Sequence, residues 1–376
     1  MTTIDETVTK PVNQRRTRLQ RDQLLSHAAA WVDERLPLVK PVNALLTYPV
    51  SQQVQKNILY TLGGLTFTSF MLQIISGILM LFYYAPSLDS AYASVDYITY
   101  QLPLGWLIRG IHVYNASAIF IFLFLHLVRT FLAGAYKKPH EITWLSGVLL
   151  LLITVGFAFT GALLPWDQKG YWATVVGTEI AGSTPIVGEW LMRLMRGGTV
   201  LGQTSLTRFF VVHTLLMPMS LLAIMGLHLS QLRHGAAAAL TPRGNRRARQ
   251  FVPFFPNRVL IHVLSGLLLL TVLIYLSWNQ RAPLEFMADP TSTSYTPRPE
   301  WYFLSLFQLL NLVPGRWELI ATQVVPGLVI GSLFLLPFVD RSEERRPWRR
   351  PIAMIIALIY ILAIIILTLT ALPAPV

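Results

Sequence analysis

Residues 107–134 read LIRGIHVYNASAIFIFLFLHLVRTFLAG, and the fold class can be argued from this segment outward. It is apolar and long enough to cross a bilayer, which takes about 20 mostly apolar residues in a helix. It nevertheless carries His112 and His126, although ionisable groups inside a membrane are costly and usually functional. Their fourteen-residue spacing is close to four helical turns. Both side chains should therefore project from nearly the same face of one helix, about 21 Å apart along its axis.

The whole chain of 376 residues has the composition of a membrane protein. It is 53% hydrophobic and only 13% charged, with a mean hydropathy of +0.52, unlike the charge-rich surface of a soluble domain. Six further apolar segments accompany the first. We expect an all-α, polytopic membrane protein with about seven transmembrane helices. The further segments are residues 58–84, 143–165, 208–232, 258–279, 321–340 and 352–373.

The formal net charge of +12 indicates orientation rather than nucleic-acid binding. Lys and Arg gather before the first segment and in alternate loops, whereas the loop 85–106 and the tail 373–376 contain none. This is the positive-inside pattern, which predicts a cytoplasmic N-terminus in a bacterial inner or other energy-transducing membrane. We find no cleavable signal peptide. Helical spacing of apolar residues over 20–36 predicts an amphipathic helix on the membrane surface, with an ordinary solvated helix as the alternative.

A second histidine pair lies in segment 208–232, where fifteen residues separate His213 from His228. This segment and 107–134 both enter from the non-cytoplasmic side. We therefore expect His112 to face His213 and His126 to face His228. The result would be two bis-histidine sites stacked across the membrane, with all four histidines as metal ligands.

Glycines repeat the same interval in the two remaining helices of the first four. Gly63 and Gly77 lie fourteen residues apart, as do Gly147 and Gly161. Glycine lets the edge of a macrocycle approach a helix backbone. A histidine or glycine taken singly could simply serve helix packing, but the joint pattern predicts a four-helix bundle around two b-type haems. The chain has no cysteine, which excludes a thioether-linked c-type haem on it.

Three cations lie near helix ends, where they could pair with haem propionates. Arg109 and Arg129 are the stronger candidates, and Lys137 is the third. For Arg129 and Lys137, snorkelling to the membrane interface explains the position equally well.

The second candidate site is the run Pro299, Glu300, Trp301 and Tyr302, on the non-cytoplasmic side with His112. In an apolar, aromatic setting, we expect the Glu300 carboxyl to have a raised pKa and to accept a proton from quinol. The alternative for Glu300 is an ordinary interfacial acid.

From about Trp31 to Ala374, the chain resembles the cytochrome b/b6 family, the haem-carrying subunit of bc1/b6f-type quinol oxidoreductases. PEWY resembles the quinol-oxidation signature of that family, and Glu300 matches its proton-accepting glutamate. The motifs that carry the resemblance are LGGLTFTSFMLQIISG, GWLIRGIHVYNAS, FLHLVRTFLAG, GALLPWDQKGYWA, TRFFVVHTLLMP and RPEWYFLSLFQLL.

The resemblance implies electron bifurcation. One quinol electron goes to a Rieske iron–sulfur protein and on to a c-type cytochrome or equivalent, while the other crosses the membrane. The low-potential haem would be the one on His112 and His213. The haem on His126 and His228 would pass its electron to a quinone near the cytoplasmic face. Both haems would be noncovalent, the complex homodimeric, and the protein a contributor to proton translocation.

Within the family, the chain looks like a fusion of cytochrome b6 with subunit IV. The fifteen-residue histidine step, the sequence PWDQKGYWA and the lack of an eighth span favour that form. Where b6-type chains tether an extra haem to cysteine, this chain has Thr61, so a covalent haem is excluded there and a noncovalent one stays open. The implied parts are an N-terminal region 1–57, a dihaem domain 58–235, a basic connector 236–257 and a subunit IV-like domain 258–376.

Other histidines bear on a cytoplasmic-side quinone site. His234 and His262 resemble positions that bc1-type chains use to bind and protonate quinone, although a solvent-facing histidine is an equal alternative for each. We interpret His27 and His140 as surface residues.

Two rival functions remain at this point. A dihaem anchor of another quinone-linked dehydrogenase would have no reason to carry PEWY or the long loop 166–207. A transporter using the histidines as a proton relay would lack haem absorption.

Overall fold

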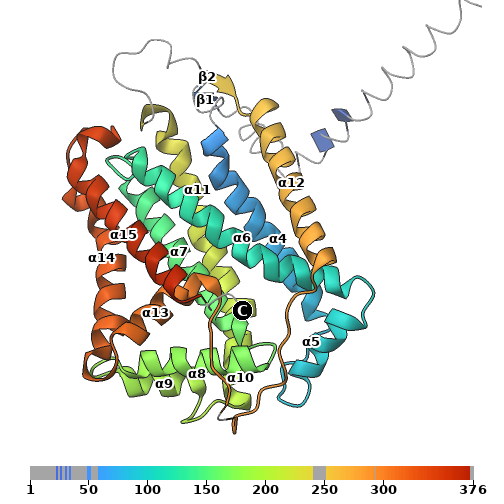
Figure 1. Cartoon of the computed structure of the whole chain (residues 1–376). Helices are drawn as coiled ribbons and strands as arrows, with labels where there is room; N and C mark the ends of the chain where they lie inside the picture. The colour runs from blue at the N-terminus through green and yellow to red at the C-terminus, as the bar shows by residue number, and fades with distance from the viewer. Residues whose placement is uncertain are drawn as a thin grey trace, which may run out of the picture. The chain divides into compact units, whose positions relative to one another are not determined.

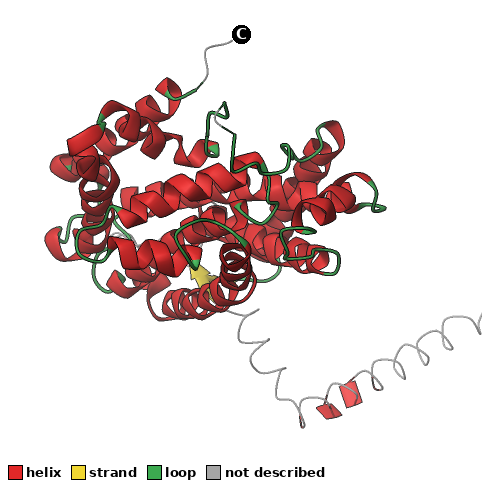
Figure 2. Cartoon of the chain, turned by 90° about the horizontal axis from the view of Figure 1, so that it is seen from below, coloured by secondary structure: helices red, strands yellow, loops and turns green. Residues whose placement is uncertain are grey.

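The computed structural model describes residues 23, 26–27, 30–31, 34, 49–51, 58–239, 251–292 and 294–372. Helices account for most of these residues (Figures 1 and 2), which confirms the all-α prediction. The helices are α4 (Leu62–Leu81), α5 (Ala91–Tyr100), α6 (Gly105–Leu132), α7 (Glu141–Ala162), α8 (Gln168–Gly182), α9 (Gly188–Arg196), α10 (Gln203–Val211), α11 (Met217–Ala239), α12 (Asn257–Asn279), α13 (Leu304–Leu312), α14 (Val325–Val339) and α15 (Pro351–Thr370).

Seven helical segments within the described ranges are long and apolar enough to cross a membrane, as predicted. Their best windows have mean hydropathies between 1.7 and 3.1. The protein is therefore an integral, multi-pass membrane protein. The spans are Leu59–Leu81, Gly105–Leu132, Glu141–Ala162, Gln203–Gln231, Arg258–Asn279, Ile320–Val339 and Pro351–Thr370.

The chain divides into two compact units. The first comprises Met1–Lys56 and Gly244–Ile261, and the second comprises Asn57–Arg243 and His262–Val376. In the first unit, β1 (Pro49–Ser51) pairs antiparallel with β2 (Phe251–Pro253), which the sequence reading did not predict. The predicted surface helix at 20–36 lies largely outside the described residues. The four predicted domain boundaries stay predictions.

Four helices of the second unit form the bundle that the intervals predicted. α4 packs along α6, and α7 packs along α11 (Figure 1). The bundle centre is apolar, with Phe70, Ile119 and Leu221 almost fully buried. Burying such side chains stabilises the helix contacts through close packing, since lipid competes for the same apolar surfaces.

Short helices gather at one end of the bundle. α8, α9 and α10 lie there together with α5 (Figure 1). Their shared core includes Leu163, Trp166, Leu206 and Phe209, all buried. Asp167 caps α8, because its Oδ1 accepts the Gly170 amide at 2.8 Å. The loop 166–207 is thus an ordered helical layer rather than a simple connector.

The C-terminal helices attach to the bundle through polar contacts. Trp144 of α7 donates to the Leu333 carbonyl of α14 at 2.7 Å. In the turn between α6 and α7, Lys137 Nζ pairs at 2.6 Å with Oδ1 of Asp340, which directly follows α14. Arg350, which directly precedes α15, donates to the Tyr136 hydroxyl at 2.7 Å.

Candidate functional site: the histidine pairs and the PEWY segment

The two histidines nearest the short-helix end meet across the bundle. His112 of α6 and His213 lie with their ring centroids 6.4 Å apart. His126 and His228, one interval further along the same helices, lie close enough to interact electrostatically. The structure therefore brings the four histidines together in the pairs that the sequence reading proposed.

A π-helical turn explains the fifteen-residue step. Residues Val212–Leu216 form a π-helix between α10 and α11, and His213 lies inside it. A π-turn hydrogen-bonds i to i+5 and so absorbs one extra residue relative to an α-helix. The fifteenth residue is taken up at this turn, which keeps His213 and His228 facing the same side of the bundle.

Each of the four repeated glycines lies against a histidine of the neighbouring helix. A Cβ built on Gly63 would lie 3.1 Å from His126 Cε1, and one on Gly77 would lie 3.2 Å from His112 Cε1. Gly147 would approach His228 Cε1 at 3.3 Å, and Gly161 would approach His213 Cε1 at only 2.6 Å. The nearest protein neighbour of each glycine is thus an imidazole, and the contact with a macrocycle edge stays a prediction. The glycines make room for histidine rings.

Hydroxyl groups beside three of these glycines fix the histidine rings. Ser76 Oγ lies 3.0 Å from His112 Nδ1, Ser146 Oγ lies 3.0 Å from His228 Nδ1, and Thr160 Oγ1 lies 3.2 Å from His213 Nδ1. Occupation of Nδ1 leaves Nε2 as the ring nitrogen that can bind a metal.

An apolar layer separates the two histidine levels. Ile119 lies seven residues after His112 and seven before His126, and Phe70 lies midway between Gly63 and Gly77. Both are buried. The two pairs are therefore separate sites, each with its own surroundings.

The PEWY segment packs against the helix that carries His112. Trp301 Nε1 donates to Ser117 Oγ at 3.1 Å. The Tyr302 ring stacks on Phe120 with centroids 4.1 Å apart. Burial, followed by the negative charge of Glu300, raises the pKa of Tyr302, so its phenol stays protonated. Pro299 is half-buried at the start of the segment.

Glu300 lies in a more polar setting than its sequence neighbours predict. Its Oε1 forms an ion pair with Lys169 Nζ at 2.7 Å, and its side chain is 42% exposed. Lys169 belongs to α8 and to the PWDQKGYWA motif. Two motifs far apart in sequence thus meet at one ion pair.

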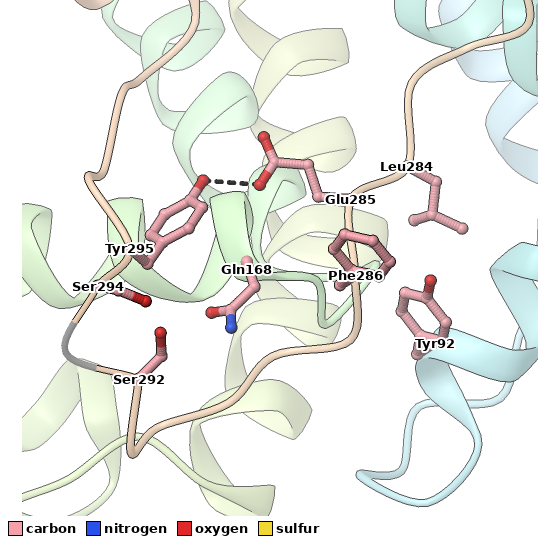
Figure 3. A pocket seen from close by; sticks show the side chains of 8 residues that line it. All are labelled: Tyr92, Gln168, Leu284, Glu285, Phe286, Ser292, Ser294 and Tyr295. Carbon is pink, nitrogen blue, oxygen red and sulfur yellow. Dashed lines mark hydrogen bonds between the residues drawn. The ribbon is translucent and has the colours of Figure 1, made fainter.

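A cavity of about 590 Å³ opens beside this region (Figure 3). Within it, the Tyr295 hydroxyl donates to Glu285 Oε2 at 2.7 Å. The described lining residues include neither Glu300 nor the four histidines. They are Tyr92, Gln168, Leu284, Glu285, Phe286, Ser292, Ser294 and Tyr295.

Comparisons with known proteins agree with this arrangement. The family model described as cytochrome b/b6/petB matches residues 45–236, about half of the chain. The chain belongs to the cytochrome b/b6 family. The model described as cytochrome b(C-terminal)/b6/petD matches residues 287–375. The two matches together confirm a fused chain that resembles cytochrome b6 plus subunit IV.

Individual relatives place the protein in a bc-type complex. A cytochrome bc complex cytochrome b subunit from Chlorobaculum thiosulfatiphilum is 35% identical over 338 residues, covering 87% of this chain and 77% of the relative. Cytochrome b6 from Synechococcus elongatus is 44% identical over 203 residues, covering 54% of this chain and 94% of the relative. A solved hyperthermophilic respiratory Complex III chain matches with a TM-score of 0.80 at 30% identity, covering 92% of both chains. The protein is the cytochrome b, and hence a redox subunit, of a bc-type quinol oxidoreductase, so a membrane anchor of another class and a transporter are set aside.

The residues of this cytochrome b fit b-type haem. Two imidazoles on one metal ion place their ring centres roughly 6 Å apart, given metal–nitrogen bonds of about 2 Å, and His112 and His213 lie at 6.4 Å. Arg129 is half-buried, with its guanidinium carbon 3.6 Å from the centre of the Tyr60 ring, and within the described part of the chain its buried Nη2 has no hydrogen-bond partner. A haem propionate would satisfy that nitrogen.

The other two predicted propionate partners are engaged elsewhere. Arg109 donates to the carbonyls of Ala282 at 2.8 Å and Pro283 at 2.6 Å. It thereby anchors the segment that follows α12. Lys137 is held by Asp340, as described above. Both cations serve to join the N-terminal bundle to later parts of the chain.

The four histidines outside the two pairs differ in their surroundings. The His262 ring lies so close to α4 that a Cβ on Gly64 would be 1.8 Å from its Cδ2. His234 lies in α11, but its side chain is outside the description. His27 is exposed, as predicted. The surface prediction for His140 is wrong: it is buried because it begins α7 within a tight turn, where its amide donates to the Lys137 carbonyl at 3.0 Å.

Sequence reasoning missed Lys169 and the hydroxyl residues beside the glycines. Lys169 could have been noticed as a cation on the side that is poor in cations. Ser76, Ser146 and Thr160 share a simpler signal, because each directly precedes a glycine of the fourteen-residue pattern.

Proposed function

We propose that this cytochrome b oxidises quinol at the outer face of a bacterial inner membrane, within a homodimeric complex that includes a Rieske iron–sulfur protein and a c-type cytochrome. Quinol loses two electrons and two protons on becoming quinone. One electron passes to the Rieske partner, and the other crosses the membrane inside this chain. Two noncovalent b-type haems, on His112 with His213 and on His126 with His228, would supply the one-electron carriers for that crossing.

The observation that carries the proposal is the docking of the PEWY segment on α6. Ser117, the partner of Trp301, lies five residues after His112, which is about 7.5 Å along the helix axis. A quinol held at this segment would lie beside the outer histidine pair. Electron transfer over a short distance then needs no movement of the helices.

Glu300 accepts one of the two quinol protons in this proposal, and the other passes to water at the outer face. Its carboxylate, held by Lys169 Nζ at 2.7 Å, can accept a proton from a quinol hydroxyl. Its exposed side chain can release that proton outward. The Tyr302 phenol, which stays protonated, can donate a hydrogen bond within the same site.

The inner site is proposed to hold a quinone that receives the crossing electron. His262 packs against Gly64, which directly follows Gly63, the glycine that faces His126. This contact supports the proposal that His262 binds quinone and supplies a proton near the inner histidine pair, and His234 is the second candidate. Cations in alternate loops support a cytoplasmic location for this end.

The experiment is to purify the native complex and measure its subunits, its reduced-minus-oxidised spectrum and its quinol:cytochrome c activity. We expect two b-type haems per chain, a Rieske subunit, a c-type cytochrome and a dimeric mass. An active complex should lose turnover when the Rieske subunit is removed. A complex that holds one b haem, or that oxidises quinol fully without a Rieske partner, would contradict the proposal.

A further inference from the structure

The four glycine–histidine contacts are equivalent except at one position. Each contact glycine is preceded by one residue on the same helix, and three of these residues carry a hydroxyl: Ser76, Ser146 and Thr160. The fourth, before Gly63, is Leu62. His112, His213 and His228 each have a hydroxyl on Nδ1. His126 faces a glycine whose neighbour has no polar group to offer, and the described part of the chain gives its ring no hydroxyl partner.

The direction of the three hydrogen bonds follows from where each hydroxyl proton goes. Ser76 Oγ donates to the Leu72 carbonyl at 2.7 Å, Thr160 Oγ1 to the Gly156 carbonyl at 2.7 Å, and Ser146 Oγ to the Thr143 carbonyl at 2.9 Å. A hydroxyl has one proton to give. With that proton directed at a carbonyl, each oxygen can accept the Nδ1–H of its histidine. A backbone carbonyl, of Gln73 for His112, Phe157 for His213 and Thr143 for His228, is a second acceptor beside the same ring. Nε2 is then left for a metal.

Such a bond changes the ligand as well as orienting it. An acceptor on Nδ1–H makes the imidazole a more basic metal ligand. A more basic ligand stabilises oxidised iron more than reduced iron, and so lowers the reduction potential. The outer pair, His112 and His213, has two such bonds, and the inner pair, His126 and His228, has one.

We propose that the hydroxyl count, two at the outer pair and one at the inner pair because of Leu62, helps to set the outer haem at the lower reduction potential. Ser76, Thr160 and Ser146 are positioning residues that act through the histidines, and Leu62 acts by lacking a hydroxyl. This inference rests on the proposed function, since it needs two bis-histidine haems. A lower potential at the outer haem makes electron transfer from the outer to the inner haem favourable. In this proposal, residues of this chain produce the difference in potential.

The test is a spectroelectrochemical titration of the purified complex, in which the two b haems are followed by their absorption bands. Ser76→Ala and Thr160→Val should each raise the outer potential. Ser146→Ala should raise the inner potential and widen the gap. Leu62→Ser should lower the inner potential relative to Leu62→Ala, which removes the same side chain without adding a hydroxyl. Each change should be up to about tenfold in the redox equilibrium, or about 59 mV for one electron.

Ser76→Thr separates the hydrogen bond from simple packing. It keeps the hydroxyl, so its outer potential should stay near wild type while that of Ser76→Ala moves. The inference is overturned if both haems are retained and no potential moves, if both potentials move together in every variant, or if Ser76→Thr shifts as far as Ser76→Ala. A wild-type complex without two b haems would instead refute the proposed function.

Discussion

The histidine pairs and the Glu300 site are held in opposite ways. Each of the four histidines lies between helices against a glycine backbone, and three of them are oriented by a hydroxyl. Glu300 lies in a connecting segment, is 42% exposed and is held by one ion pair with Lys169. Buried rings in a packed bundle have one position, whereas an exposed carboxylate can change partner. This difference suits fixed electron carriers on one side and a proton acceptor that must bind and release on the other.

Substitution of one of the four paired histidines should have the largest effect. His112→Ala or His213→Ala should remove one haem, about half the haem content, and abolish turnover, because the haem that this pair would hold loses one of its two histidines. His126→Ala or His228→Ala should remove the other haem. The haem-to-protein ratio and the spectrum measure this outcome. His27→Ala, at an exposed position, is the matched control. Loss of both haems from every folded variant would refute the pairing.

Glu300→Gln should impair proton transfer and leave haem binding unchanged. We expect quinol oxidation to slow by about 10²–10⁴-fold, the usual contribution of a general base, with haem content intact. Steady-state turnover and the haem spectrum are the measurements. Glu189→Gln, which removes an exposed acid paired with Arg193, is the control and should leave turnover unchanged. Unchanged turnover in Glu300→Gln would remove Glu300 from the mechanism.

Gly161→Ala tests how closely a histidine ring packs against the glycine of the neighbouring helix. The added Cβ would lie 2.6 Å from His213 Cε1, so we expect a loss of about 1–3 kcal/mol in stability and weaker retention of the outer haem. Gly147→Ala, at 3.3 Å from His228 Cε1, should cost less. Thermal loss of haem absorption orders the variants. Gly226→Ala in α11 is the control, because nothing lies within 4 Å of its Cβ position. Equal effects at all three positions would contradict the contact argument.

Lys169→Met should give the smallest effect. Without the ammonium group, the Glu300 side chain loses its ion pair and is held less firmly beside the quinol. Both partners are partly exposed, and an ion pair of this kind contributes about 0–1 kcal/mol, so we expect turnover to fall by less than about fivefold. Steady-state turnover is the measurement. Lys138→Met, at an exposed position, is the control and should leave turnover unchanged. A loss of turnover as large as that of Glu300→Gln would contradict a purely positioning role for Lys169.

Hydropathy and helical periodicity are enough to predict the seven spans, the bundle of the first four long helices and the position of each histidine and glycine along its helix. These are local properties, because hydropathy marks a span and helical periodicity assigns a face. The fused family form followed from motifs that are contiguous in the chain. The fourteen-residue spacing of the histidines and glycines is visible in the sequence for the same reason, because both members of each pair lie on one helix.

The contacts that each of these groups makes could be learned only from the folded structure. Helix periodicity does not reveal that His213 lies in a π-turn, nor that the glycines accommodate imidazole rings. It also does not bring Lys169 to Glu300, which come from segments far apart in the chain. The apolar neighbours of Glu300 in sequence predicted a drier site than the fold provides, because side chains from another helix set the environment of a loop residue. Contacts of this kind depend on how helices pack, and packing is a property of the whole bundle.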